Sequence, residues 1–272
     1  MQAHSVSPRQ MVLSLWQNRS LLRALVKREV IGRYQGSVMG ILWSFFNPVF
    51  LLAVYTFVFS VVFKARWNVG SDSKTEFALV LFAGLLVFNL FSECLNRAPG
   101  LILGNANYVK RVVFPLEILP FVSMGASLFH MLISLLVWFV FYLIFFGVPH
   151  LTALLFPIVM LPLVAFTLGI SWILSSLGVY LRDMVQLIGM VTTTLMFLSP
   201  VFFPVSALPV EYQGWLEMNP LTPAIEQVRG VLIWGTLPSL RVFAVQGLVS
   251  MIVAWIGFAW FQKTREGFAD VV

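Results

Sequence analysis

The chain has 272 residues, of which 60% are hydrophobic and only 10% are charged, and its mean hydropathy is +0.92. These values exclude an ordinary soluble domain and indicate an integral membrane protein. The formal net charge of +6 does not require a nucleic-acid partner, because the basic residues gather in segments that a membrane protein places against anionic lipid or a cytoplasmic partner.

The first segment, 10–33, is predicted to form an amphipathic helix at the membrane interface. Met11, Leu15 and Leu22 recur at helical spacing, which favours an apolar face. The other side is basic and offers a docking surface for a partner, with these residues: Arg19, Arg23, Lys27, Arg28 and Arg33. An equally good interpretation is a basic flank that only sets the topology.

Long apolar windows predict the membrane-spanning helices, since about 20 apolar residues cross the hydrocarbon core. The predicted fold is all-α, because the windows do not show the polar–apolar alternation of barrel strands. Six spans are expected, at about 38–63, 77–97, 117–146, 151–180, 184–204 and 240–262. The whole chain, 1–272, is interpreted as a single transmembrane domain.

The orientation follows from the distribution of Lys and Arg. With a cytoplasmic N-terminus, twelve of the 17 basic residues fall on the cytoplasmic side, which is the expected asymmetry. Both termini are therefore predicted to be cytoplasmic. Cys94 is the only cysteine, so an intramolecular disulfide is not possible.

Segment 206–236 is too broken to be a simple span. It contains Pro209, Pro220 and Pro223 together with several charged side chains, and such a backbone is tolerated at membrane depth only when protein or a water-filled cavity surrounds it. An alternative is an interfacial loop that Trp215 and Trp234 anchor at the membrane surface.

The sequence contains no motif that predicts nucleotide binding, metal binding or catalysis. None of the five lysines follows a glycine, so a phosphate-binding Walker A loop is not expected. We find no cluster of metal ligands and no nucleophile with a base, and we predict neither a catalytic residue nor a metal site. An ion-coupled carrier would need ionisable groups inside its spans; the candidate there is His130, which is more simply a hydrogen-bonded packing residue.

Several sequence blocks together resemble the type-2 ABC exporter permeases, and especially the branch that exports O-antigen, capsule and teichoic acid polysaccharides. The resemblance covers nearly the whole chain in the same order. The blocks are KREVIGRYQGSVMGILWSFFNP at 27–48, NANYVKRVVFPLEILP at 105–120, GVYLRDM at 178–184, SPVFFPVSALP at 199–209 and MNPLTPAIEQVRG at 218–230.

The resemblance implies a permease that pairs with a second copy and with two separate ATPase subunits, which would bind the ATP and magnesium. Loop 98–115 would be the cytoplasmic coupling loop that contacts the ATPase, through Asn105, Asn107, Tyr108, Val109, Lys110 and Arg111. Alternatively, its basic residues only set the topology. Segment 206–236 would be a re-entrant helix pair that narrows the periplasmic exit, with these gate residues: Pro204, Pro209, Asn219, Pro220 and Arg229.

The predicted function is export of a lipid-linked polysaccharide across a bacterial inner membrane. Aromatic rings stack on the apolar faces of sugars, so the first span suggests channel-lining candidates, namely Trp43, Phe46, Tyr55 and Phe59. An ABC exporter of a drug or small lipid is the alternative, and an ion-coupled carrier without an ATPase is a more distant one.

Overall fold

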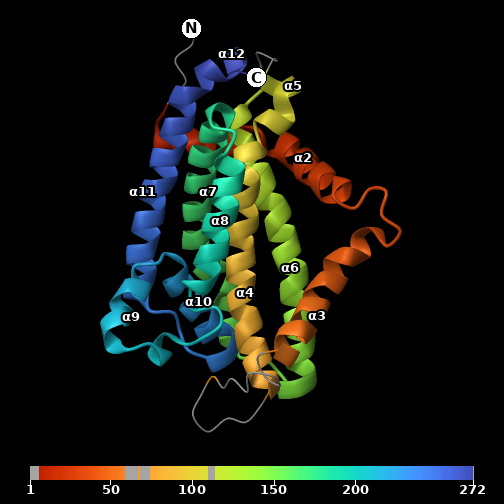
Figure 1. Ribbon diagram of the computed structural model, residues 1–272, viewed down its shortest axis with the longest axis vertical. Coiled ribbons are helices and arrows are strands. Elements are labelled where there is room, and N and C mark those ends of the chain that lie inside the picture. The colour runs from red at the N-terminus through yellow and green to blue at the C-terminus, as the bar shows by residue number, and fades with distance from the viewer. Residues whose placement is uncertain (1–5, 59–66, 68–73, 110–113, 272) are drawn as a thin grey trace.

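The computed structural model describes residues 6–58, 67, 74–109 and 114–271. Within these ranges the chain is helical and contains no strand. The long helices stand side by side, and the two ends of the chain lie at the same end of the molecule as the short helix α5 (Figure 1). The predicted all-α class is confirmed for these residues.

The N-terminal segment forms two helices rather than the single one predicted. Helix α1 (Pro8–Gln17) begins after Ser7, whose hydroxyl accepts a hydrogen bond from the Gln10 amide at 3.2 Å, as an N-cap residue does. Helix α2 (Arg19–Gly32) follows directly. The chain bends at Asn18, which leaves the helical region with φ −97° and ψ 16°.

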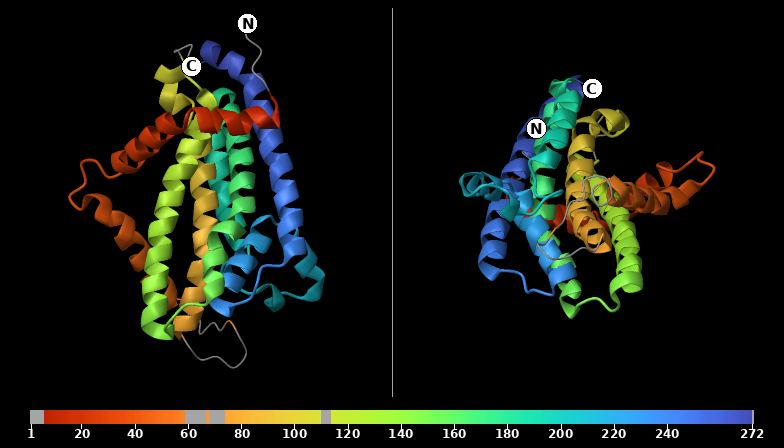
Figure 2. Two further views of the ribbon diagram at one scale, coloured as in Figure 1. Left: turned by 180° about the vertical axis from the view of Figure 1, so that it is seen from behind. Right: turned by 60° about the horizontal axis from the view of Figure 1, so that its bottom comes forward.

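Helices α2 and α3 form a V whose tip points away from the helix bundle (Figures 1 and 2). The short helix η1 (Gly40–Leu42) leads into α3 (Trp43–Tyr55). Only one side of α3 is buried, through Ser44, Pro48 and Leu52. These residues lie four apart and therefore share one face of the helix.

The centre of the bundle is α4 (Lys74–Arg97), which is apolar and buried over most of its length and packs against α6 (Leu119–Phe146) and α7 (Phe156–Tyr180). The last long helix, α11 (Leu240–Thr264), runs along α7. The two backbones approach closely, because a Cβ atom on Gly169 would lie 2.6 Å from the carbonyl oxygen of Val253. Small residues commonly permit such packing between membrane helices.

Five helical stretches of the described chain are long and apolar enough to span a membrane: Gly40–Val58, Thr75–Gly100, Leu116–Phe146, Leu151–Tyr180 and Leu240–Val271. The predicted span 184–204 is only partly helical. Its helix, α8 (Met184–Phe197), has 14 residues, or about 21 Å at the usual rise. The chain then turns at Ser199, so a sixth full span is not confirmed.

Shorter helices connect the long ones. At the end that carries the chain termini these are η3 (Ala98–Gly100), η4 (Leu103–Asn105), α5 (Ala106–Val109), η5 (Leu116–Ile118), η9 (Arg265–Gly267) and α12 (Phe268–Val271). The remaining connections are η6 (Leu151–Leu155), η7 (Val205–Ala207), α9 (Val210–Glu217), α10 (Leu221–Arg229) and η8 (Gly230–Trp234).

Candidate functional site

The predicted coupling loop contacts the predicted interface helix. Tyr108, in α5, stacks its ring on Phe114 with centroids 4.2 Å apart and planes 8° from parallel. Arg28, in α2, donates a hydrogen bond to the Tyr108 hydroxyl at 2.6 Å. Arg28, a predicted docking residue, and Tyr108, a predicted ATPase-contact residue, are therefore in direct contact. Lys110 and Arg111 lie outside the described residues.

The rest of α2 divides into a packed side and an exposed basic side. Leu25 and Val30 are buried, and Leu25 packs with Ile118 and Val122 at the start of α6. The predicted docking residues lie on the exposed side: Arg19, Arg23, Lys27, Arg28 and Arg33. This arrangement agrees with the amphipathic pattern, and the docking role itself stays a prediction.

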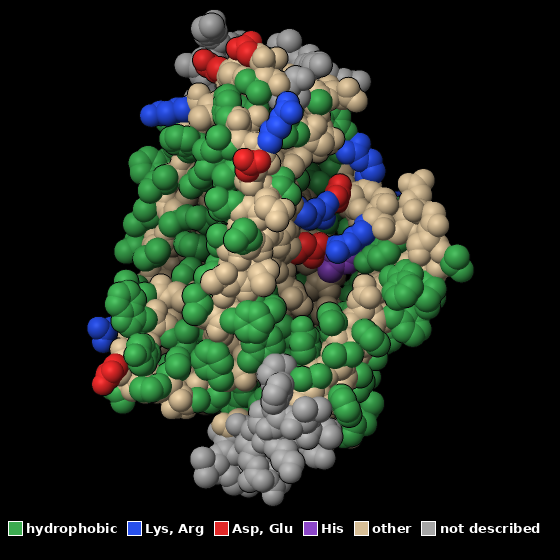
Figure 3. All heavy atoms as spheres, in the orientation of Figure 1, with side chains coloured by type: hydrophobic (Ala, Val, Ile, Leu, Met, Phe, Trp, Pro, Cys, Tyr) green, Lys and Arg blue, Asp and Glu red, His purple; other side chains and the backbone are tan. Residues whose placement is uncertain are grey.

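Ion pairs attach α2 to the end of α4. Arg33 pairs with Glu93, and Arg97 pairs with Glu29. Arg97 also approaches Glu93, four residues earlier, at 3.8 Å. Figure 3 shows basic and acidic side chains gathered where the V formed by α2 and α3 meets the bundle. The ends of α2 and α4 are therefore joined by charge.

Glu117 connects four segments at the same end, a role that the sequence analysis missed. Its carboxylate accepts hydrogen bonds from Ser14 in α1 at 2.9 Å and from Arg265 at 2.7 Å. Its backbone carbonyl accepts from Trp172 in α7 at 3.1 Å. The sequence offered one signal for this role. Glu117 is the first residue of the predicted span 117–146, and a carboxylate at that position needs a partner because an unpaired charge in a membrane is costly.

Segment 206–236 forms two short helices, α9 and α10, that meet at Asn219 and Pro220. The Asn219 side chain accepts from the Leu221 amide at 3.0 Å and donates to the Leu198 carbonyl at 3.1 Å and to Ser199 at 2.9 Å. It therefore fixes the turn against the end of α8. Pro209 precedes α9, and Pro204 precedes η7. Whether these residues form a gate stays a prediction.

Arg229, one of the predicted gate residues, is fully buried. Its guanidinium donates to the carbonyl oxygens of Val80 at 3.1 Å, Pro200 at 2.5 Å and Val201 at 2.8 Å. Glu226, one turn earlier, supplies the countercharge at 3.1 Å. Gly84 leaves the necessary room, since a Cβ there would lie 2.7 Å from Arg229 Nη2. The arginine thus joins α10 to α4 and to the turn after α8.

The channel-lining candidates on α3 differ in their surroundings. Trp43 is 43% exposed and Phe46 is 46% exposed, so both rings face outward from this single chain. Tyr55 instead packs against Phe202, with ring centroids 6.1 Å apart. Phe59 lies outside the described residues. Their role in a channel stays a prediction.

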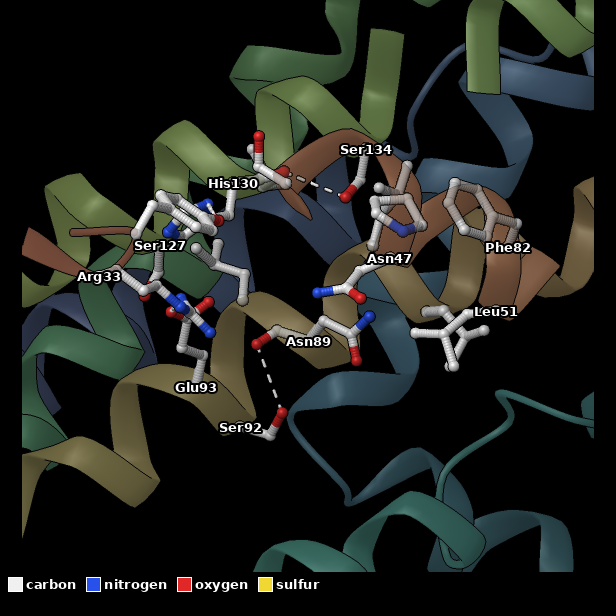
Figure 4. Close-up of a pocket in the computed structure, with 17 residues that line it drawn as sticks. Arg33, Asn47, Leu51, Phe82, Asn89, Ser92, Glu93, Ser127, His130 and Ser134 are labelled. Atoms are coloured by element: carbon white, nitrogen blue, oxygen red, sulfur yellow. Dashed lines mark hydrogen bonds and ion pairs between the residues drawn. The ribbon is translucent and has the colours of Figure 1, made fainter. Parts of the chain in front are cut away.

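A polar pocket lies between α3, α4 and α6 (Figure 4). At its end beside Arg33 and Glu93 the Tyr34 hydroxyl contacts His130 Nδ1 at 3.2 Å, so His130 is hydrogen-bonded, as the sequence analysis expected. Burial raises the pKa of Tyr34 above its ordinary value, so the hydroxyl remains a hydrogen-bond donor over a wider pH range. The part of the chain that the structure describes holds no cluster of metal-binding side chains.

These features define a multi-pass membrane protein with short connecting helices at one end, a V of two helices beside the bundle, and a pair of short helices of which α10 is buried and α9 is largely exposed. A family model described as ABC-2 type transporter matches residues 20–233. The chain therefore belongs to the ABC-2 type transporter family. It is a transporter permease and not an enzyme.

Curated relatives match almost end to end. The chain is 29% identical to the O-antigen export system permease protein RfbA of Myxococcus xanthus, over 96% of this chain and 99% of that protein. It is 25% identical to RfbA of Klebsiella pneumoniae, over 93% of this chain and 95% of that protein. It is 23% identical to the polysialic acid transport protein KpsM of Escherichia coli, over 90% and 93% of the two chains.

Proposed function

We propose that this chain is the transmembrane permease subunit of an ATP-driven exporter of a lipid-linked, O-antigen-like polysaccharide. The observation that carries the proposal is the end-to-end match to a protein named as an O-antigen export permease, over 99% of that protein's length. A match of this extent includes the loops as well as the spans. The similarity to a polysialic acid transport protein supports the same class of substrate.

The proposed complex contains a second copy of this chain and two ATPase subunits, which bind ATP and magnesium. Segment 105–111 is the proposed ATPase contact. The bond between Arg28 and Tyr108 supports this, because a push on α5 would be transmitted directly to α2. The ion pairs between α2 and α4 would then transmit the movement of α2 to α4, the central helix of the bundle.

The protein is proposed to lie in a bacterial inner membrane with both termini in the cytoplasm. Two features support this: both termini lie with α5 at one end (Figure 1), and the basic docking residues of α2 are exposed. The helices α9 and α10 then form the re-entrant pair at the periplasmic exit. Exposed rings of α3, including Trp43 and Phe46, would line the path between the two copies.

The test is deletion of the gene in the bacterium that carries it, followed by complementation with the wild-type chain. We expect the deletion to remove the surface polysaccharide and to cause lipid-linked polysaccharide to accumulate inside the cell, and the wild-type gene to reverse both. Surface polysaccharide can be followed by gel electrophoresis, and the lipid-linked form by extraction and mass spectrometry. An unchanged surface polysaccharide with altered drug sensitivity would instead favour the drug exporter.

A further inference from the structure

The polar pocket between α3, α4 and α6 has a volume of about 290 Å³. That is just below the range of roughly 300–1,000 Å³ for small-molecule sites, and such a volume fits one ring rather than an oligomer. Asn89 lies eight residues from the end of α4, or about 12 Å along the helix axis. The pocket therefore reaches from its end beside Arg33 and Glu93 into the depth of the bundle.

The wall of the pocket carries neutral hydrogen-bonding groups on all three helices. Asn47 on α3 and Asn89 on α4 extend toward one another (Figure 4). On α6, Nε2 of His130 is buried and has no hydrogen-bond partner, and the buried hydroxyl of Ser127 has only the weakly bonding thiol of Cys94 beside it. If the Tyr34 hydroxyl donates to His130 Nδ1, Nε2 carries the hydrogen and is a free donor. Buried polar groups normally find partners, which a ligand or water supplies here.

Charge and shape indicate the class of ligand. The ionised side chains in the wall, Arg33 and Glu93, pair with each other, so no cation is left over for a phosphate. The floor is apolar and contains the ring of Phe82 and the side chains of Leu51 and Met131. Amides and hydroxyls around an apolar floor complement a neutral sugar, which has hydroxyls at its edge and C–H groups on its faces.

We propose that this pocket binds one neutral sugar residue of the lipid-linked glycan before the glycan is exported. The inference rests on the proposed function, because it assumes a glycan substrate. Asn47, Asn89, Ser127 and His130 supply the hydrogen bonds to sugar hydroxyls. The lipid chain remains in the membrane beside α3, which is buried on one face only. The pocket thus selects the sugar that enters the export path.

The test measures sugar binding to the permease–ATPase complex in lipid nanodiscs by saturation-transfer NMR. The probes are methyl glycosides of the neutral monosaccharides found in the organism's own surface glycan, and inorganic pyrophosphate serves as the anionic probe. The variants are Asn89→Leu and Ser127→Ala. Ser123→Ala is the matched control, since Ser123 is on the same helix and its hydroxyl is also buried, but it does not line this pocket.

We expect at least one glycoside to bind the wild type, about three- to tenfold more weakly to Ser127→Ala, and not measurably to Asn89→Leu. The Ser123→Ala control should bind like the wild type, and pyrophosphate should not compete. Equal binding by all variants would overturn the proposal, as would pyrophosphate binding that Asn89→Leu abolishes. If the wild type exports glycan but binds none of the glycosides, the pocket is a water-filled cavity and the proposal is wrong. Loss of the proposed function itself would be seen separately, as unchanged surface glycan in the deletion strain.

Discussion

At the scale of single residues, the buried charge of Arg229 is stable only because its donors are satisfied. Its guanidinium donates hydrogen bonds to the carbonyl oxygens of Pro200 and Val201. Both carbonyls lie in the turn after α8, where no helical hydrogen bond satisfies them. Each buried acceptor that loses its donor costs about 1–3 kcal/mol. Glu226 is 44% exposed, so water can solvate its carboxylate when the arginine is removed. The main loss is therefore at the carbonyl groups.

Replacement of this arginine should destabilise the fold. We expect Arg229→Met to lower the melting temperature of the purified protein, measured by tryptophan fluorescence in detergent, because the turn carbonyls lose their donors. Gly84→Ala should do the same, since the added Cβ would lie 2.7 Å from Arg229 Nη2. Arg241→Met is the matched control at an exposed position. A wild-type melting temperature for Arg229→Met would contradict this account of the network.

At the scale of elements, short contacts connect helices that are far apart in the sequence. Arg28 and Tyr108 join α2 to α5, and Glu117 and Arg265 join the start of α6 to the end of α11. Arg265 also donates to the carbonyl of Phe114 at 2.8 Å. Since Phe114 stacks on Tyr108, the two contacts belong to one continuous set around the predicted coupling loop.

The first of these contacts should affect coupling rather than insertion. We expect Tyr108→Ala to reduce export strongly, because it removes both the stacking on Phe114 and the bond to Arg28. Tyr108→Phe should have an intermediate effect, since the ring stays. Export is measured as surface polysaccharide, and insertion as the amount of protein in the membrane. Tyr212→Ala is the control at an exposed tyrosine of α9; equal export by all three variants would contradict the coupling role.

The second contact should contribute to stability. The side chains of Arg265 and Glu117 are only 13% and 9% exposed, and breaking a buried pair by removing one partner costs about 3–5 kcal/mol in the strongest cases. We expect Glu117→Gln and Arg265→Gln each to lower the melting temperature. The double variant should lose less than the sum of the two, because no unpaired charge remains. Glu266→Gln, at the exposed neighbouring position, should have no effect.

At the scale of the whole molecule, one end carries the termini, the predicted coupling loop and the exposed basic side of α2 (Figure 1). The many exposed apolar side chains of α3, α6 and α11 match what lipid or a second copy would cover. The single cysteine, Cys94, is buried, so it would resist a thiol reagent from either side of the membrane. A topology experiment therefore needs cysteines placed elsewhere.

The orientation can be tested in a Cys94→Ser background with one added cysteine. A cysteine at Val210, which is 83% exposed in α9, should react with an impermeant maleimide added outside spheroplasts. A cysteine at Gln17, exposed at the end of α1, should react only after the membrane is permeabilised. These results follow if α1 is cytoplasmic and α9 periplasmic. The reversed pattern would show that the charge asymmetry had been misinterpreted.

Much of this architecture is determined by short stretches of sequence. Long apolar runs must form helices in a membrane, because backbone groups in hydrocarbon have no water to bind; the predicted spans 77–97, 117–146 and 151–180 accordingly agree closely with α4, α6 and η6 with α7. The prolines of segment 206–236 likewise show that it cannot form one continuous helix. Each of these features depends on residues that are near one another in the chain.

Only the tertiary structure decided the polar contacts and the ends of some helices. Arg229 bonds to Val80, 149 residues away, and Arg265 to Glu117, 148 residues away, and no local pattern identifies such partners. The same holds for the bend at Asn18 and the end of α8 at Phe197, and for the pocket that three separate helices enclose. A buried polar group is stable only where distant segments supply its partner, so its position is settled by packing rather than by the sequence around it.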